Sequence, residues 1–389
     1  MWKSIRVYYY DDNKEDLLLN GVGPIFRTLR DGYGVTRQAI RRHWKFGPHL
    51  ELLIDTAQTG EDRFDRELLP FIRGGLESYL EASPSTRSID PDAYAQISRK
   101  LGAWELEPGP YEPLYPDNSI AVGPSSDKSD VLNGQEPQKA LRTFYAETAG
   151  FILEGVERTK GNEAARYSLI VQLMAVTGSL FPEDGLLRGH LSYRSHVEGY
   201  VHQFRDRQAV RKQFADCNSR FGRHMLLAVR NVTEYTDSGM YIGADPLLRG
   251  WSAAAKRLYE RAYDLSLDGR LNASTGHYKE IAKRLGGEAV ARWDEGAENG
   301  EMSDFHRRLL HAEGKERFFQ SPSFAAYRIP VNGLYALMPL FGITPHVKHL
   351  LCELISTAVE RLYGTTWQEL TERLVKPDKE RRGIIIHEA

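Results

Sequence analysis

The sequence predicts an α+β fold, in which an N-terminal mixed sheet with packed helices is followed by a mainly helical half. Residues 5–10 and 36–55 alternate apolar and polar side chains with a period of two, as strands with one buried face do. Residues 17–29 and 62–80 instead repeat apolar side chains at steps of three and four, which is typical of amphipathic helices. Helical patterns dominate from residue 138 onward, so the predicted strands are confined to the N-terminal part of the chain, where helices pack on the sheet.

Residues 36–55 predict a hairpin of two strands separated by Gly47-Pro48, because proline cannot donate to a central ladder. In the first strand Arg41 and His43 share the face opposite the bulky side chains. In the second strand His49 and Glu51 lie opposite an apolar face. Both an ordinary half-exposed hairpin and a site built from these polar side chains fit this pattern. The bulky residues of the two strands are Ile40, Trp44, Phe46, Leu50, Leu52 and Ile54.

Residues 105–137 interrupt the regular patterns. Prolines recur here among Gly, Ser, Asp and Asn, which predicts a long loop or flap. Its segment 111–115 either packs on the N-terminal lobe or belongs to a flexible crossing between lobes. We therefore expect an N-terminal α+β lobe at 1–104, this loop at 105–137, and a mainly helical lobe at 138–389 that completes the same fold.

The helical half shows periodic apolar segments without a fixed repeat, which argues against a solenoid. Pro330, Pro339 and Pro345 are expected to divide the last apolar segment into short helices, because a proline ends or kinks what precedes it. The segments are 141–156, 165–176, 251–267, 277–285, 288–293, 303–311 and 331–362.

Composition and charge exclude several classes of protein. A net charge of −2 and a pI near 6.7 provide no basic field for general nucleic-acid binding. No apolar run approaches the roughly 18–20 residues that span a bilayer, and the first residues, MWKSIRVYYYDD, do not resemble a signal peptide. Cys217 and Cys352 are the only cysteines, too few for a disulfide framework or a cysteine-rich zinc site. We expect a cytoplasmic protein without membrane contact.

The stretch 189–204, GHLSYRSHVEGYVHQF, has two possible interpretations. As a strand it would align Arg194, His196, Glu198, Tyr200 and His202 on one face. As a helix, which we prefer, it has Ser195 as the N-cap and Glu198 three residues later, the pattern of a capping box. His196 and Tyr200 then share a face at a helix start, where anionic groups are favoured. A structural Glu198 with an exposed His196 fits equally well.

Motifs for metal and nucleotide chemistry are missing from the sequence. There is no HExxH, no Cys pair, no phosphate-binding glycine loop and no nucleophile elbow. The remaining chemistry is acid–base work by His, Tyr, Glu and Arg, with no metal and no bound cofactor expected.

Three segments resemble the C-terminal domain of lantibiotic dehydratases: the tyrosine-rich strand Trp2–Tyr10, the helix at Leu17–Leu19, and the stretch HWKFGPHL at His43–Leu50. Free-standing members of this family include glutamate-eliminating halves of split dehydratases and the pyridine synthases of thiopeptide pathways. The resemblance implies a maturation enzyme whose partner is a leader-bearing precursor peptide, alongside other pathway enzymes.

One departure separates the branches of this family. The resemblance implies that eliminating members carry arginines after the bend, which hold the glutamyl leaving group. This chain has Glu51 and Leu53 at those positions, and a carboxylate repels a departing carboxylate. Glutamate elimination is therefore disfavoured unless Arg41, Arg42 or Arg194 substitutes.

The resemblance thus favours a pyridine synthase, which joins two dehydroalanines by a formal [4+2] cycloaddition and then loses water and the leader peptide. Tyrosine and histidine suit the proton transfers, and positioning requires polar contacts to the peptide. The candidate catalytic residues are His43, His49, Tyr193, His196 and Tyr200. The candidate substrate-binding residues are Arg41, Arg42, Trp44, Glu51, Arg194 and Glu198.

Two alternatives remain. The chain can be the glutamate-eliminating half of a split dehydratase with relocated arginines. It can also be a non-catalytic subunit that binds the leader peptide, for example by pairing it with an exposed strand edge near residues 3–10.

Overall fold

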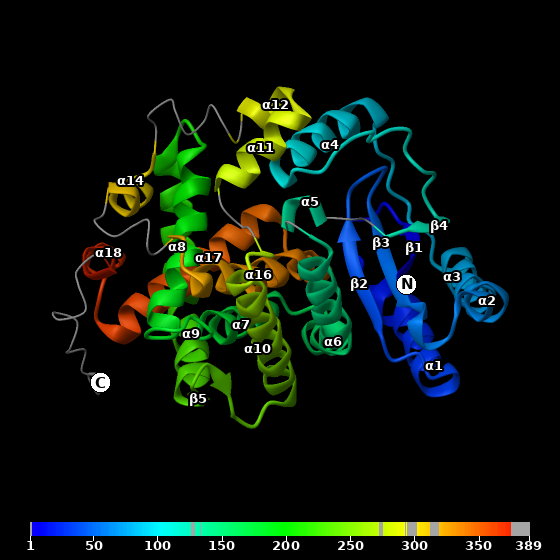
Figure 1. Cartoon of the computed structure of the whole chain (residues 1–389), viewed down its shortest axis with the longest axis horizontal. Coiled ribbons are helices and arrows are strands. Elements are labelled where there is room, and N and C mark those ends of the chain that lie inside the picture. Colours follow the sequence, from blue (N-terminus) through cyan, green and yellow to red (C-terminus); the bar gives the residue numbers. More distant parts are fainter. Residues whose placement is uncertain are drawn as a thin grey trace. The chain divides into compact units, whose positions relative to one another are not determined.

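The computed structural model describes residues 2–125, 129–132, 134–271, 275–291, 293, 302–311 and 319–374. It confirms the predicted α+β class, with a small sheet near the N-terminus and mostly helices after it (Figure 1). The chain divides into two compact units. The first unit comprises Met1–Gly161, Thr275–Glu295 and Ala336–Gly342, and the second comprises Asn162–Ser274, Gly296–Tyr335 and Ile343–Ala389.

The first unit contains a sheet of β1 (Trp2–Tyr8), β2 (Gln38–His43), β3 (His49–Asp55) and β4 (Ser119–Pro124). The order is β2-β3-β1-β4, and every neighbouring pair in it is antiparallel. The expected hairpin is therefore confirmed, but the expectation of a mixed sheet is wrong. The predicted free edge near residues 3–10 is also wrong, because β1 is hydrogen-bonded on both sides.

The turn of the hairpin differs from the expected alternation. Strand β2 ends at His43, and residues 44–48 form the turn. Phe46 has a φ of 63° and Gly47 a φ of 115°, both in the left-handed region that breaks a ladder. Trp44 and Phe46 consequently do not extend the bulky face of β2. Strand β3 is buried along its whole length, including its polar residues, so the alternative of a half-exposed hairpin is wrong for this strand.

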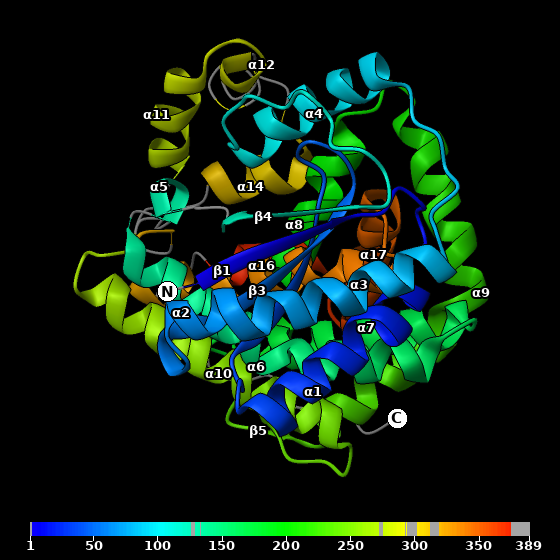
Figure 2. The same cartoon turned by 90° about the vertical axis from the view of Figure 1, so that its right-hand side faces the viewer.

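Helices of the first unit pack beside this sheet. Helices α1 and α3 lie on one side of it, and α6 runs along β2 (Figures 1 and 2). Pro24 and Pro70 lie in the first turns of α1 and α3. Backbone N–H groups in a first turn have no acceptor within the helix, so the missing N–H of proline costs no helical hydrogen bond there. The helices are η1 (Leu17–Val22), α1 (Gly23–Tyr33), η2 (Thr56–Gln58), α2 (Glu61–Arg63), η3 (Phe64–Leu68), α3 (Leu69–Ala82), α4 (Pro91–Glu105), α5 (Ser129–Leu132), α6 (Gln135–Thr159), α11 (Thr275–Leu285), α12 (Gly287–Val290) and η5 (Met338–Phe341).

The proline-rich stretch is more ordered than the sequence indicates. It contributes β4, so the expectation of loop alone across 105–137 is wrong where the structure describes it. Tyr115 stacks on Tyr8 with ring centroids 4.6 Å apart, and its backbone N–H donates to the carbonyl of Phe46 at 3.0 Å. The alternative in which segment 111–115 packs on the N-terminal strands is therefore confirmed.

The second unit is helical apart from a short hairpin, β5 (Thr236–Asp237) with β6 (Met240–Tyr241), within its described residues. Helix α17 packs against α7, α8 and α9, which makes these four helices the core of the unit. No described helix combines the length and the apolar character that a bilayer crossing requires. The helices are α7 (Glu163–Gly178), α8 (Leu186–His202), α9 (Arg207–Glu234), α10 (Pro246–Leu267), α14 (Asp304–His311), α16 (Pro322–Leu337), α17 (Pro345–Tyr363) and α18 (Trp367–Leu374).

Residues 189–202 of the stretch 189–204 are helical, which confirms the preferred interpretation over the strand. The capping box is wrong, because α8 begins after Gly185 and Ser195 lies in its middle. His196 and Tyr200 therefore do not lie at a helix start. Pro330 lies inside α16 and does not divide it, whereas Pro345 begins α17 as expected. Part of the predicted helix 288–293 lies outside the described residues.

Candidate functional site

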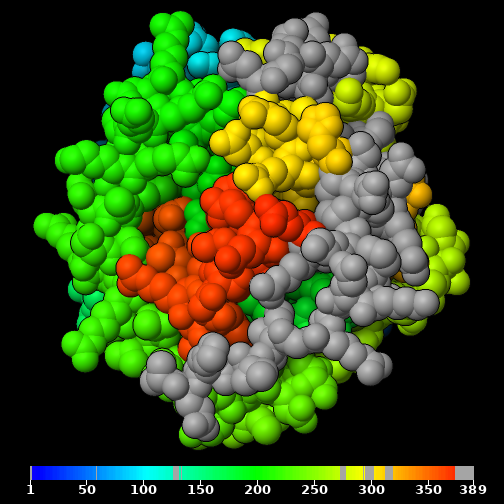
Figure 3. Space-filling view, turned by 90° about the vertical axis from the view of Figure 1, so that its left-hand side faces the viewer, coloured from blue at the N-terminus to red at the C-terminus, as the bar shows by residue number. Residues whose placement is uncertain are grey.

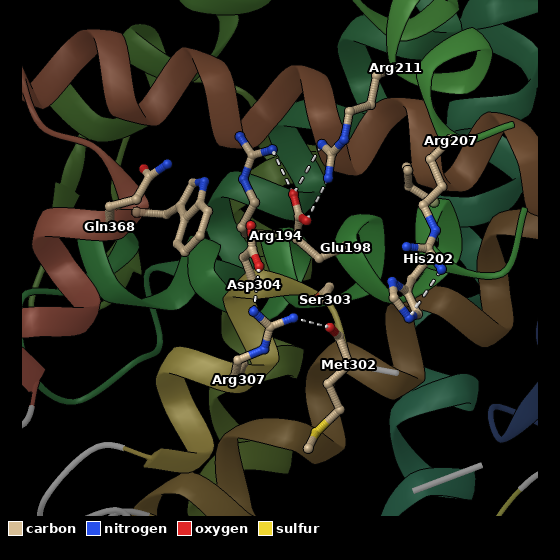
Figure 4. Close-up of a pocket in the computed structure, with 12 residues that line it drawn as sticks. Arg194, Glu198, His202, Arg207, Arg211, Met302, Ser303, Asp304, Arg307 and Gln368 are labelled. Atoms are coloured by element: carbon tan, nitrogen blue, oxygen red, sulfur yellow. Dashed lines mark hydrogen bonds and ion pairs between the residues drawn. The ribbon is translucent and has the colours of Figure 1, made fainter. Parts of the chain in front are cut away.

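A pocket of about 600 Å³ lies between α8, α9, α14 and α18 in the second unit (Figure 4). Two residues singled out by sequence, Arg194 and Glu198, line it from α8. Figure 3 shows the face on which α14, in yellow, and α18, in red, lie next to green helices. The lining residues are Arg194, Glu198, Val201, His202, Arg207, Arg211, Met302, Ser303, Asp304, Arg307, Trp367 and Gln368.

Buried charges hold α8 against its neighbours at the floor of this pocket. Arg194 is 5% exposed and places its two terminal nitrogens 2.7 Å from Glu353 and 3.1 Å from Glu360, both on α17. Glu198 is 3% exposed and accepts two hydrogen bonds from Arg211 of α9, at 2.8 and 3.4 Å. Such fork-shaped contacts fix geometry as well as charge, so the pocket has a rigid, ionic floor.

The rim of the pocket carries further charge on α9 and α14. Arg307 lies 3.2 Å from Asp304 and donates to the carbonyl of Met302. Arg207 lies 3.5 Å from His202. Figure 4 shows the Arg207–His202 pair at one side of the pocket and Arg307, with Asp304 and Met302, at another, around the group of Arg194, Glu198 and Arg211.

A second set of groups lies along α8 toward α17. The hydroxyl of Tyr200 is 3.0 Å from Nδ1 of His346, and its ring stacks on His349 with centroids 4.0 Å apart. Burial raises the pKa of Tyr200 and lowers the pKa of His349 to about 4. At neutral pH a protonated phenol therefore lies against a neutral imidazole. A protonated phenol can donate a proton and a neutral imidazole can accept one, and neither group is charged before the transfer.

Sequence reasoning identified Tyr200 but missed both of its partners. His346 and His349 follow Pro345 with a spacing of three residues, which places them on one face of a helix that begins at the proline. That spacing could have identified the two histidines as neighbours from the sequence.

His196 and Tyr193 occupy different environments on the same helix. His196 packs edge-on against Tyr335 with centroids 4.7 Å apart. Burial, followed by the charge of Lys348, lowers its pKa well below the usual value. Tyr193 is fully buried, donates to the carbonyl of Met174 at 2.7 Å, and has a pKa raised well above the usual value by burial. Tyr193 therefore anchors α8 to α7.

The hairpin residues lie in the first unit, where the bend brings His43 and His49 together as cross-strand partners with ring centroids 5.6 Å apart. His49 is 3% exposed, its Nδ1 lies 2.9 Å from the carbonyl of Gly47, and its ring contacts Tyr8. Burial lowers the pKa of His49 to about 4. The pair is thus part of a packed aromatic cluster.

The other hairpin residues also contact neighbours within the first unit. Arg41 lies 3.5 Å from Glu51, and Ser4 donates to the same carboxylate at 2.8 Å. Arg42 donates to the carbonyl of Pro339 at 3.4 Å. Trp44 donates to Glu105 at 3.2 Å. The first unit therefore holds Arg41, Arg42, Trp44, Glu51, His43 and His49, and the second holds Tyr193, Arg194, His196, Glu198 and Tyr200.

Among the residues that the structure describes, no group of three or more His, Cys, Asp or Glu side chains is placed to hold a metal ion.

The family model described as "Lantibiotic biosynthesis dehydratase C-term" matches residues 2–311. The chain belongs to this family. The resemblance drawn from the tyrosine-rich strand and the hairpin is confirmed. Family membership supports a role in the maturation of ribosomally made peptides. No curated protein sequence matches the chain.

Two solved structures resemble this family member over nearly the full length of both chains. The pyridine synthase TbtD from thiomuracin biosynthesis has a TM-score of 0.70 and 25% identity, over 93% of this chain and 99% of that one. TsrL has a TM-score of 0.67 and 18% identity, over 97% of this chain and 99% of that one, which is a likeness of fold alone.

Proposed function

We propose that this chain matures a ribosomally made peptide by forming a pyridine-type ring from two dehydroalanines. The observation that carries this proposal is the likeness to TbtD, described as a pyridine synthase, over almost the whole of both chains. The departure of Glu51 from the arginine expected in eliminating members supports the same branch of the family, because its carboxylate is engaged by Arg41 and Ser4.

The proposed reaction needs the two alkenes to be held close together. It also needs proton transfers of two kinds, one that tautomerises an amide and others that assist the departure of the leaving groups. The amide beside one dehydroalanine moves its N–H proton to oxygen, which creates a 2-azadiene. The second alkene adds across this diene, so that two carbon–carbon bonds form. The former carbonyl carbon then loses its hydroxyl as water, and the leader peptide leaves as its carboxamide to make the ring aromatic. No oxidant is consumed, because both aromatising steps are eliminations.

We assign the proton transfers to Tyr200 with His346. A tautomerisation catalyst needs an acid and a base within one hydrogen bond of each other, and the phenol and imidazole are 3.0 Å apart. The stacked His349 holds the phenol ring in place, and its pKa of about 4 keeps it neutral at working pH. His196, also neutral, is the second candidate acceptor on α8. Arg194 and Glu198 are assigned to substrate binding through the pocket that they line.

The test uses the purified chain with a leader-bearing peptide that contains two dehydroalanines. We expect mass spectrometry to show the leader carboxamide together with a core product whose mass corresponds to loss of that carboxamide and one water. The control reaction uses a peptide with alanine at one of the two positions, which cannot cyclise. Unchanged dehydroalanine peptide in a sample that still binds it would overturn the ring-forming proposal and favour the leader-binding subunit.

A further inference from the structure

We propose that the pocket between α8, α9, α14 and α18 binds a carboxylate side chain of the substrate peptide. This inference rests on the proposed function only in taking a peptide as the substrate. The inference specifies that the segment of the peptide recognised by this pocket is acidic.

The charge on the pocket wall is the first support. Four arginines line it (Arg194, Arg207, Arg211 and Arg307). Glu353 and Glu360 engage Arg194, Glu198 engages Arg211, and Asp304 lies beside Arg307. Both oxygens of Glu198 already accept from Arg211, so this carboxylate is neutralised within the wall. Arg307 and Asp304 are more than half exposed, and pairs of that kind contribute little stability. A ligand carboxylate can therefore replace Asp304 as the partner of Arg307.

An unused donor is the second support. Arg194 is 95% buried, and its Nε has no hydrogen-bond acceptor among the described residues, although its terminal nitrogens are bound to Glu353 and Glu360. Leaving such a buried N–H unsatisfied costs free energy. This atom is also shielded from solvent, so a ligand oxygen in the pocket supplies the missing acceptor only where the Arg194 side chain shifts to meet it.

The remaining lining decides the type of carboxylate. Val201, Met302 and Trp367 give the pocket apolar walls beside its arginines. A glutamate side chain has an aliphatic stem that suits these walls and a planar head that suits the fork of a guanidinium. The volume of about 600 Å³ exceeds one side chain, so the pocket has room for the backbone that carries it.

The test is fluorescence anisotropy with a labelled dodecapeptide of Gly, Ser and four Glu, and with the same peptide carrying Gln at those four positions. We expect the glutamate peptide to bind about tenfold more tightly, and this advantage to shrink at high salt. Arg307→Gln should remove most of the advantage. Arg220→Gln, an exposed arginine on α9 outside this pocket, is the matched control and should leave binding unchanged. Arg211→Gln is unsuitable, because it would leave Glu198 buried without its main partner.

Three outcomes would overturn the inference: equal binding of the two peptides, a glutamate preference that survives Arg307→Gln, or free glutarate competing as strongly per molecule as the peptide. The last would assign the pocket to a small free carboxylate. Ring formation is measured separately on the dehydroalanine peptide. Normal cyclisation without carboxylate preference defeats only the subsite, and carboxylate preference without cyclisation defeats only the proposed reaction.

Discussion

Arg41 on β2 and Glu51 on β3 face each other as cross-strand partners, with a guanidinium nitrogen 3.5 Å from the carboxylate. The Glu51 side chain is almost fully buried, and burial alone would raise its pKa. The charge of Arg41 and the hydrogen bond from Ser4 outweigh burial and lower that pKa below its usual value. The position where the family resemblance implies an arginine for the leaving group is therefore occupied by a buried structural anion.

Glu51→Gln should destabilise the protein by about 3–5 kcal/mol, because it removes the buried carboxylate charge that faces the Arg41 cation at 3.5 Å. Urea denaturation followed by circular dichroism measures the change. Ser4→Ala is the matched control. It removes one hydrogen bond to the same carboxylate and should cost only about 1 kcal/mol. Equal stability of Glu51→Gln and the parent would show that the pair contributes nothing.

The chain should release no glutamate from a glutamylated peptide. The carboxylate of Glu51 repels a leaving carboxylate, and Arg41 is already engaged by it. Mass spectrometry of the incubated peptide gives the answer, with the dehydroalanine peptide run in parallel as a control for enzyme activity. We also expect Glu51→Arg to create no eliminating activity, because the new cation would face Arg41. Efficient glutamate release by the unmodified chain would contradict both the role of Glu51 and the ring-forming assignment.

Acidification from pH 6.5 toward pH 4 should destabilise the first unit. The pKa of His49 is about 4 in the folded chain and about 6.5 in the unfolded chain, so the unfolded state binds more protons in this window. The contribution of His49 to the free energy of unfolding is therefore fully present above pH 6.5. It is lost as the pH decreases toward 4, by up to about 1.4 kcal/mol per pH unit.

Urea midpoints measured at several pH values between 4 and 8 test this slope. His49→Phe keeps a buried ring beside Tyr8 and His43 but cannot take up a proton, so its stability should depend less steeply on pH. The variant loses the contact with the Gly47 carbonyl, which lowers stability at every pH alike. Parallel curves for the two proteins would mean that His49 titrates normally.

Tyr200→Phe should lower the rate of ring formation at least about 100-fold, because it removes the donor that faces His346. Its stability should fall by only about 1 kcal/mol, the net contribution of one hydrogen bond. Single-turnover kinetics with the dehydroalanine peptide and thermal unfolding measure the two effects. Tyr259→Phe changes a half-buried tyrosine on α10 and should leave the rate unchanged. A normal rate for Tyr200→Phe would remove this residue from the mechanism.

Local pattern determined much of the first unit. The alternation in residues 36–55 was enough to predict β2, β3 and the meeting of His43 and His49, because a short turn leaves antiparallel pairing as the only arrangement. The same pattern failed at Trp44 and Phe46, since positive φ values in the turn end the strand early. The pattern also overstated the exposure of the polar residues in β3. A period of two identifies one buried face, but whether the opposite face is covered depends on elements far away in the chain.

The sequence by itself determined the α+β class, the hairpin, the helical state of α8 and the family, because helix and strand periodicity and the HWKFGPHL stretch are all local. Tertiary structure alone decided that β1 is an interior strand, since strand order is set by long-range pairing with β3 and β4. It also decided the partners of Tyr200 and Glu198, which come from α17 and α9. Helix packing creates these contacts between residues as many as 146 positions apart, and no local pattern encodes such a distance.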